Sequence, residues 1–252
     1  MKTFPKKRKN EDLIIGVQAI KTALAENKTF NKVFVQKGER EMGIELLLKV
    51  LRKVKTTIQY VPKEKLDRLT NRNHQGIAAL LSPVAYADIN VVLANVYETG
   101  DLPIVALLDG ITDVGNFGAI ARSALALGVH ALVIPAKSGV SITADALKTS
   151  SGALLDIPVC RVGNLAETAQ LLKSSGLRMI GATEKGSLPI KLIPQDIPIG
   201  LVLGAEDTGI SEEMLDLIDD EVVIPMFKKT TGSLNVAAAA AICFYELGTR
   251  NF

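Results

Sequence analysis

Three polar segments of the chain hold side chains that could do chemistry, and each adjoins an apolar run. They are DGITDVGNFGAIARSALALG (residues 109–128), LGAEDTGI (203–210) and IPMFKKTTGSLNVAAAAAICFYEL (224–247). In the first, Asn116 stands at the entrance to a helical pattern and Arg122 lies nearly two turns inside it. A guanidinium among apolar residues requires an anionic or carbonyl partner, so Arg122 indicates either anion binding or a structural salt bridge.

The glycines of the first segment do not match a known phosphate-binding pattern. A P-loop requires Gly-x4-Gly-Lys-Ser/Thr, but Asn116 follows Gly115 at the position of the lysine. A dinucleotide fingerprint requires Gly-x-Gly-x2-Gly, whereas the glycines here are Gly110, Gly115 and Gly118. A nicotinamide-dependent dehydrogenase is therefore disfavoured.

The second and third segments add an acid and two residues that often begin helices. Gly204 would let a ligand approach the backbone closely, and Glu206 follows the end of an apolar run. Ser233 and Asn235 precede the alanine-rich stretch, and their side chains can satisfy free N–H groups at a helix start. N-capping alone is one interpretation of this pair, and a site shared with the other two segments is the alternative.

From Leu102 onward, short apolar runs alternate with helical patterns, as in a mostly parallel α/β sheet with helices on both faces. Ligands of such folds bind at the carboxyl ends of the strands, where several runs here end in Gly, Thr or an acid. The expected strands are 104–109, 131–135, 157–162, 178–183, 200–206 and 221–225, and the expected helices are 118–127, 143–154, 165–174, 212–218 and 236–247.

The first third of the chain reads as a basic arm at residues 1–10 followed by a small α/β domain at residues 11–83. His74 precedes a predicted strand, where a structural role is favoured over a functional one. Residues 84–101 are expected to form a linker, partly helical at 88–98. Within the small domain we expect a helix at 14–26, a strand at 32–36, a helix at 43–54, a strand at 56–62, a short turn at 63–69 and a strand at 76–83.

The charge is unevenly distributed along the chain. Residues 1–83 carry 18 Lys and Arg against 8 Asp and Glu, whereas residues 84–252 carry 11 against 19. A basic first third indicates contact with a polyanion, a solvated basic surface being the alternative. Because only 4% of the residues are aromatic and Trp is absent, we expect contact through phosphates and RNA shape rather than base stacking. No DNA partner is expected.

The composition also indicates where the protein is located and whether it binds a metal. No apolar run is long enough to span a membrane, and the basic N-terminus lacks the apolar run of a secretory signal. Cys160 and Cys243 lie in apolar contexts without CxxC spacing, as in a reduced cytoplasmic protein. With two histidines in the chain, no metal site is expected.

Taken together, the motifs NFGAIAR, GAEDTG and IP followed by SLNVA resemble, in order and approximate spacing, those of the SpoU (TrmH) family of the SPOUT superfamily. These are RNA ribose 2′-O-methyltransferases. The resemblance covers residues 102–252, and the basic first domain, with its HQGIAAL run, looks like the RNA-binding extension of that family. The arrangement is most similar to the bacterial enzymes that methylate a guanosine ribose in 23S ribosomal RNA.

The resemblance implies S-adenosylmethionine as methyl donor, a C-terminal trefoil knot and a homodimer in which the alanine-rich last helix packs closely. Carried over by motif position, the catalytic group would be Asn116, Arg122, Glu206, Ser233 and Asn235. The cofactor would be held by Thr183, Gly204, Ala205, Glu206, Ile224, Met226, Ser233 and Leu234.

The hypothesis for catalysis is electrostatic. Arg122 would lie against the ribose 2′-oxygen or an adjacent phosphate and stabilise developing negative charge, and Glu206 would anchor the loops. Two departures bear on which nucleotide is methylated: Val114 stands where the family usually has proline, and the stretch 226–232 looks one residue longer than usual. A transfer RNA 2′-O-methyltransferase and a non-catalytic RNA-binding or ribosome-assembly factor on the same fold remain the alternatives.

Overall fold

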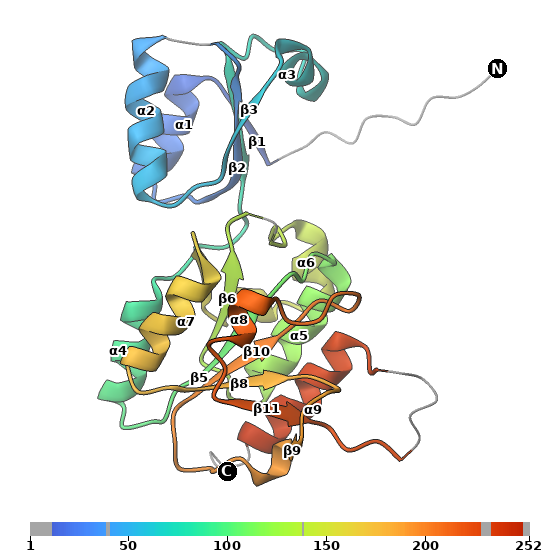
Figure 1. Ribbon diagram of the computed structural model, residues 1–252. Helices are drawn as coiled ribbons and strands as arrows, with labels where there is room; N and C mark the ends of the chain where they lie inside the picture. The colour runs from blue at the N-terminus through green and yellow to red at the C-terminus, as the bar shows by residue number, and fades with distance from the viewer. Residues whose placement is uncertain (1–11, 39–40, 138, 228–232, 249–252) are drawn as a thin grey trace, which may run out of the picture. The chain divides into compact units, whose positions relative to one another are not determined.

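The computed structural model describes residues 12–38, 41–137, 139–227 and 233–248. It divides the chain into two compact units, residues 1–83 and 84–252, which are treated separately below (Figure 1). The predicted basic arm at residues 1–10 lies outside the described residues, and so do residues 228–232 of the stretch 226–232 that looks one residue longer than usual.

The first unit is a four-stranded sheet in the order β1-β4-β2-β3. Its central strand β4 runs antiparallel to β1 and β2, while β2 and β3 are parallel. Helices α1 and α2 build one apolar cluster with the sheet, around Ile20, Ile44 and Leu51, and Leu66 of α3 belongs to another with Phe34. The elements are β1 (Leu13–Ile15), α1 (Val17–Ala25), β2 (Phe30–Gln36), α2 (Met42–Lys53), β3 (Ile58–Val61), α3 (Lys63–Leu69) and β4 (Ile77–Leu81).

Two expectations for the first unit were wrong. Ile14 and Ile15 belong to β1 and pair with β4, because Gly16, with φ of 86°, ends the strand before α1 starts. Residues 63–69 form helix α3 rather than a turn, since burial of Leu66 against the sheet stabilises a segment too short to show a clear helical period.

The second unit contains a seven-stranded sheet in the order β7-β6-β5-β10-β8-β11-β9, and all of its pairings are parallel. The predicted fold class, a mostly parallel α/β sheet with helices on both faces behind a small α/β domain, is confirmed. The strands are β5 (Ile104–Leu108), β6 (Ala131–Pro135), β7 (Val159–Val162), β8 (Arg178–Ala182), β9 (Leu188–Pro189), β10 (Ile199–Leu203) and β11 (Asp220–Val223).

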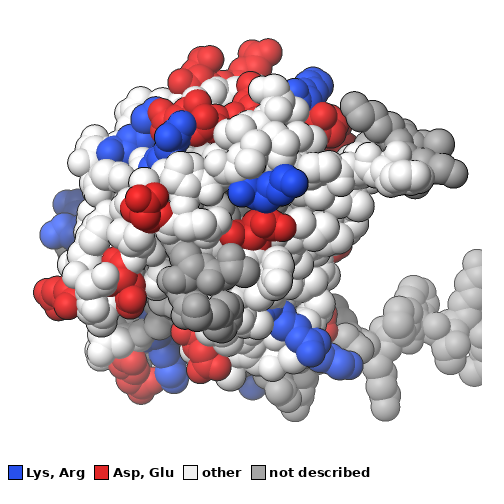
Figure 2. Space-filling model, turned by 90° about the horizontal axis from the view of Figure 1, so that it is seen from below, with Lys and Arg blue, Asp and Glu red and all other residues white. Residues whose placement is uncertain are grey.

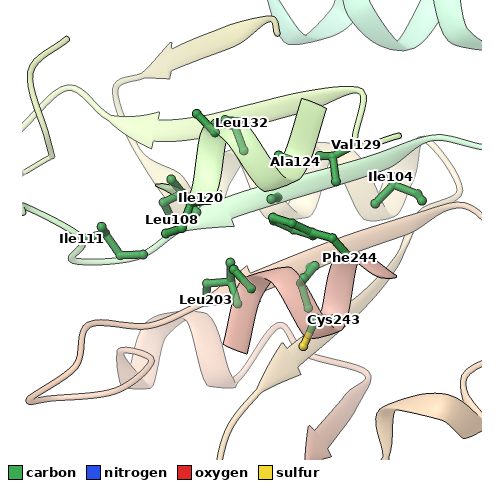
Figure 3. Packing of buried hydrophobic residues seen from close by; sticks show 14 of the residues in the cluster. Ile104, Leu108, Ile111, Ile120, Ala124, Val129, Leu132, Leu203, Cys243 and Phe244 are labelled. Atoms are coloured by element: carbon green, nitrogen blue, oxygen red, sulfur yellow. The ribbon is translucent and has the colours of Figure 1, made fainter. Parts of the chain in front are cut away.

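Successive side chains along a strand point to opposite faces of the sheet, and each face has its own apolar core. Ile104, Ala106 and Leu108 of β5 belong to the core that includes α5, α6 and α9, where Phe244 of α9 points towards the sheet (Figure 3). Val105 and Leu107 belong to the core that includes α4, α7 and α8. These helices are α4 (Ile89–Glu98), α5 (Val114–Ala126), α6 (Ala144–Thr149), α7 (Leu165–Ser174), α8 (Glu212–Leu215) and α9 (Val236–Gly248), with short 3₁₀ turns at Ala153–Leu155 and Ile190–Leu192.

The segment 84–101, expected to be a linker, is part of the second unit. Asp88 caps α4, and one face of that helix is buried in the sheet's second core. The apolar residues of this face recur at helical spacing and so form one continuous apolar stripe. This stripe packs in the second core, so the segment does not serve as a linker between the two units. They are Ile89, Val92, Leu93 and Val96. In the described part of the chain no helix has the length and apolar character needed to cross a membrane.

Candidate active site

A pocket of about 300 Å³ opens where the neighbouring strands β10, β8 and β11 end. Leu203 ends β10 and Gly204 follows it, Ala182 ends β8 and Thr183 follows it, and Ile224 follows β11. Because these parallel strands all end at one edge of the sheet, residues far apart in sequence meet there. Ser233 and Leu234, just before α9, complete the wall.

The loop after β10 folds back on itself and presents Glu206. Ala205 pairs with Gly209 as an isolated antiparallel bridge, with N···O distances of 3.1 and 2.9 Å. A Cβ atom at Gly204 would lie 2.2 Å from the carbonyl carbon of Gly209 and 2.3 Å from the amide nitrogen of Ile210. The fold of this loop therefore requires glycine at position 204, independently of any ligand.

Asn235 connects all three polar segments. Its Nδ2 donates to Oδ1 of Asn116, at 3.0 Å, and also to Oε1 of Glu206. Its Oδ1 accepts from the backbone N–H groups of Ala237 and Ala238, at 3.0 and 3.4 Å, so Asn235 also caps α9. Asn235 therefore caps α9 and, in the same position, bonds to residues of the other two segments; its part in catalysis stays a prediction.

The cap fixes which way the amides point. Because backbone N–H groups must donate to Oδ1 of Asn235, its Nδ2 faces Asn116 and Glu206. Asn116 must then present its Oδ1 to Asn235. Its own Nδ2 has no hydrogen-bond partner within the described ranges and remains available to donate to a bound molecule.

Asn116 is itself positioned by the start of α5. Asp113 caps this helix by accepting from the N–H of Asn116 at 2.7 Å, and Val114 is its first residue. Helices α5 and α9 pack against each other in the same core (Figure 1), which brings their first turns together. Glu206 adds a further tie, accepting from the N–H of Val236 at 3.3 Å.

All residues proposed to hold the cofactor line the pocket: Thr183, Gly204, Ala205, Glu206, Ile224, Met226, Ser233 and Leu234. Sequence reasoning missed three further carboxylates there, namely Glu184, Asp207 and Glu221, and one cation, Lys185. The sequence could have indicated them, because each lies beside one end of a predicted strand: Glu184, Lys185 and Asp207 after strands 178–183 and 200–206, and Glu221 at the start of strand 221–225. Carboxylates thus outnumber the one cation among the described charged residues of the pocket, and Leu203, Val223 and Ala239 are among its apolar residues.

Arg122 is the exception among the predicted site residues. It lies exposed on α5, does not line the pocket, and makes no hydrogen bond or ion pair with any residue of known placement. It follows Asn116 by six positions, which at about 100° per residue puts the two on different sides of the helix. Among the described residues the salt bridge considered for Arg122 is therefore not formed, and the described lining of the pocket does not include this guanidinium.

Two models of known protein families match parts of this chain. The model of the SpoU rRNA methylase family matches residues 103–245, and a model for RNA 2′-O ribose methyltransferase substrate binding matches residues 13–87. The chain belongs to the SpoU rRNA methylase family. As a member of this family it is an RNA methyltransferase.

Relatives of this SpoU methylase extend over both units. A protein of Staphylococcus haemolyticus assigned to the TrmH family of tRNA/rRNA methyltransferases is 37% identical over 238 residues, which cover 94% of this chain and 95% of the relative. A counterpart in Staphylococcus aureus strain MSSA476 is 36% identical over 237 residues, with the same coverage of both chains.

The fold of this SpoU methylase also matches solved structures. The SpoU methyltransferase AviRb of Streptomyces viridochromogenes, solved in complex with AdoMet, aligns with a TM-score of 0.59 at 24% identity, covering 98% of this chain and 94% of AviRb. A TrmH family protein of Porphyromonas gingivalis aligns with a TM-score of 0.57 at 23% identity, covering 94% and 89%. At these identities the likeness concerns the fold.

Proposed function

We propose that this protein is a cytoplasmic homodimer that methylates a ribose 2′-hydroxyl in structured RNA, a guanosine of 23S ribosomal RNA, using S-adenosylmethionine. The observation that carries the proposal is the hydrogen-bonded cluster of Asn116, Glu206 and Asn235 beside the pocket at the strand ends. The choice of ribosomal RNA is supported by the family model, and the choice of guanosine rests on the resemblance of the two-domain arrangement to bacterial enzymes that methylate a guanosine ribose in 23S ribosomal RNA.

The pocket residues fit S-adenosylmethionine. A sulfonium and an ammonium group favour carboxylates, and Glu184, Asp207 and Glu221 supply them. The apolar wall, including Leu203 and Ile224, suits an adenine ring. Lys185 is a counter-charge for the carboxylate of the methionine part.

The protein's own residues have to orient the hydroxyl and favour loss of its proton. When bound, S-adenosylmethionine supplies an electrophilic methyl group. Asn116 Nδ2 is directed away from Asn235 and can donate to the ribose oxygen, while Glu206 holds the first turn of α9 in place. A cation at the 2′-oxygen or the adjacent phosphate would stabilise the developing charge, and this is the role proposed for Arg122.

A second copy of the chain would supply that cation. Helix α9 exposes Ala238, Ile242 and Tyr245 at i, i+4 and i+7, with the ring of Tyr245 58% exposed. Leu125 of α5 is also exposed, one turn beyond Arg122. A homodimer built on α5 and α9 would bury these apolar side chains and bring Arg122 of the partner subunit to the pocket.

Mixed dimers test this arrangement. Chains carrying Arg122→Ala and chains carrying Asn235→Ala are each expected to be inactive. If the arginine acts across the interface, a heterodimer keeps one intact site, so a random mixture recovers about a quarter of wild-type methyl transfer. If each chain uses its own arginine, the mixture stays inactive and the proposed assembly is contradicted.

The substrate is tested by mapping 2′-O-methyl groups in ribosomal and transfer RNA from cells with and without the protein. Loss of one mark at a 23S guanosine is expected. Loss of a mark in transfer RNA alone would replace the proposed substrate, which the tRNA/rRNA names of the relatives leave open.

A further inference from the structure

The first unit contains a polar cleft of about 480 Å³ that takes no part in the site described above. It lies among the start of α3, the loop between α3 and β4, the end of β2 and the residue before α2. Its volume is within the range of small-ligand sites. The cleft is lined by Gln36, Glu41, Lys63, Asp67, Asn71, Arg72, Asn73, His74, Gln75 and Gly76.

A buried histidine holds the loop of this cleft in shape. His74 is 6% exposed, and its Nδ1 accepts the N–H of Gly76 at 3.0 Å. The ring proton must therefore be on Nε2, which donates to Oδ1 of Asp67 on α3, also at 3.0 Å. His74 thus has the structural role expected from the sequence, and it joins α3 to the start of β4.

The rest of the loop is equally constrained. Gln75 has φ of 49°, and its Oε1 lies so close to Gly16 that a Cβ there would be 2.9 Å away. The N–H of Gln36 donates to the carbonyl of Gly76 at 2.8 Å, and Asn73 Oδ1 accepts from the N–H of Gln75 at 3.2 Å. Gln75 and its neighbours are thus fixed on several sides, so the loop holds one shape at the edge of the cleft.

Several polar side chains of the cleft remain unused. Asn71 and Arg72 are exposed, and neither side chain is hydrogen-bonded or ion-paired within the described ranges; the same holds for Lys63. Amide side chains carry a donor and an acceptor together, as the edge of an RNA base does. The two cations of the cleft are balanced by Glu41 and Asp67, so its charge alone does not make it a phosphate site.

We infer that this cleft binds an unpaired RNA base by its edge, with Asn71 reading the base and Arg72 and Lys63 contacting the flanking phosphates. The inference rests on the proposed RNA methylation and adds a recognition site on the first unit. Single-stranded loops and bulges expose base edges, whereas the major groove of duplex RNA is too narrow for side chains to read. Recognition by an edge also needs no aromatic platform, and no Phe, Tyr or Trp is among the described residues that line this cleft.

The test compares RNA binding by the full chain on two kinds of probe, measured without S-adenosylmethionine. One probe is an RNA duplex; the others are the same duplex closed by six-nucleotide loops of A, C, G or U. The wild-type chain is expected to bind at least one looped probe about 10-fold more tightly than the duplex. Asn71→Ala should remove most of that preference while leaving duplex binding unchanged.

A matched pair of arginine variants controls for charge. Arg52 ends α2, about 16 Å along the helix from Glu41 at the cleft, and its side chain bonds to Tyr60 at 3.1 Å. Arg72→Ala is expected to weaken binding of the preferred looped probe more than Arg52→Ala does. Both residues are exposed, and thermal unfolding of each variant verifies that it is folded.

Equal affinity of the wild-type chain for duplex and looped probes would overturn the inference, as would equal effects of Asn71→Ala on both. Methyl transfer is measured separately on cellular RNA. A chain that methylates RNA but does not discriminate loops refutes this inference alone. A chain that discriminates loops but transfers no methyl group refutes the proposed function alone.

Discussion

Asn235 caps α9 and also orients Asn116 and Glu206, and two substitutions can separate these roles. Serine is a good N-cap but has no amide to reach both partners. Asn235→Ser should therefore keep the stability of the wild-type chain within about 0.5 kcal/mol, whereas Asn235→Ala should lower it by about 1 kcal/mol. Both should lower methyl transfer by about 100-fold or more. Denaturant unfolding and single-turnover rates measure the two effects.

The comparison has a clear negative outcome. If Asn235→Ser is as active as the wild-type chain, Asn235 is a helix cap only and the orientation of Asn116 has no role in transfer.

Arg122 is expected to act in the transition state and not in cofactor binding, because its proposed contact is the ribose 2′-oxygen or the adjacent phosphate of the RNA. Arg122→Ala should lower turnover by about 100-fold or more while changing the affinity for S-adenosylmethionine little. Calorimetry of cofactor binding beside rate measurements tests this. An equal loss in both would assign Arg122 to the cofactor.

Cys243 offers a probe of the core rather than of the site. Burial, together with the charge of nearby Glu246, raises the pKa of the Cys243 thiol to about 12. Because the thiolate is the reactive form, alkylation at pH 8 should be very slow in the folded chain and fast after unfolding in denaturant. Rapid labelling of Cys243 under native conditions would mean that α9 separates from the sheet.

At the scale of elements, the contact between α5 and α6 depends on one glycine. A Cβ at Gly118 would lie 2.6 Å from Cβ of Thr149 and 3.0 Å from the amide nitrogen of Ser150. Gly118→Ala should destabilise the second unit by about 1–3 kcal/mol and displace the helix that carries Asn116, so activity should fall as well. The same substitution at Gly43 of α2, where the nearest atoms are at 3.8 Å, should be neutral or stabilising. Thermal unfolding of both variants measures the difference.

Strands and helices with long, clear periods could be predicted from the sequence; α7, for instance, spans the predicted residues 165–174. Short elements could not, because α3 and β1 depend on tertiary contacts of Leu66 and of strand β4. The role of 84–101 was missed because helical spacing at Ile89 to Val96 shows an apolar face but not what covers it.

The site was predictable to a similar extent. The motifs indicated that Asn116, Glu206 and Asn235 would meet, and their hydrogen bonds agree with that hypothesis. The sequence could not show that Arg122 faces away from them, because a helix position gives no direction until its neighbours are known. The trefoil knot implied by the resemblance stays a prediction.

At the scale of the whole molecule, the boundary between the units suggests where the chain can be cut. A chain beginning at Val84 keeps α4 and should fold and bind S-adenosylmethionine. One beginning at Leu102 removes the apolar face of α4 from the core that includes Val105 and Leu107 and should be unstable. Circular dichroism and calorimetry compare the two. Equal stability of both chains would show that α4 contributes little to the second core.

RNA affinity should depend on the first unit. On the face shown in Figure 2, acidic and basic side chains are interspersed with broad uncharged areas between them. The excess of Lys and Arg lies in residues 1–83. If this part neutralises about six phosphates, log affinity should fall with log salt at a slope of about −4 to −5, and the chain beginning at Val84 should lose most RNA affinity. Undiminished RNA binding by that chain would contradict this division of labour.

The most direct test of the central claim is the position of the transferred methyl group. Purified protein is incubated with methyl-labelled S-adenosylmethionine and ribosomal RNA from cells lacking the protein, and the RNA is digested to nucleosides and analysed by mass spectrometry. The label is expected on the ribose 2′-oxygen of guanosine, and the Asn235→Ser variant should transfer almost none. Label on a base, or no label in RNA with a folded protein that binds the cofactor, would contradict the account.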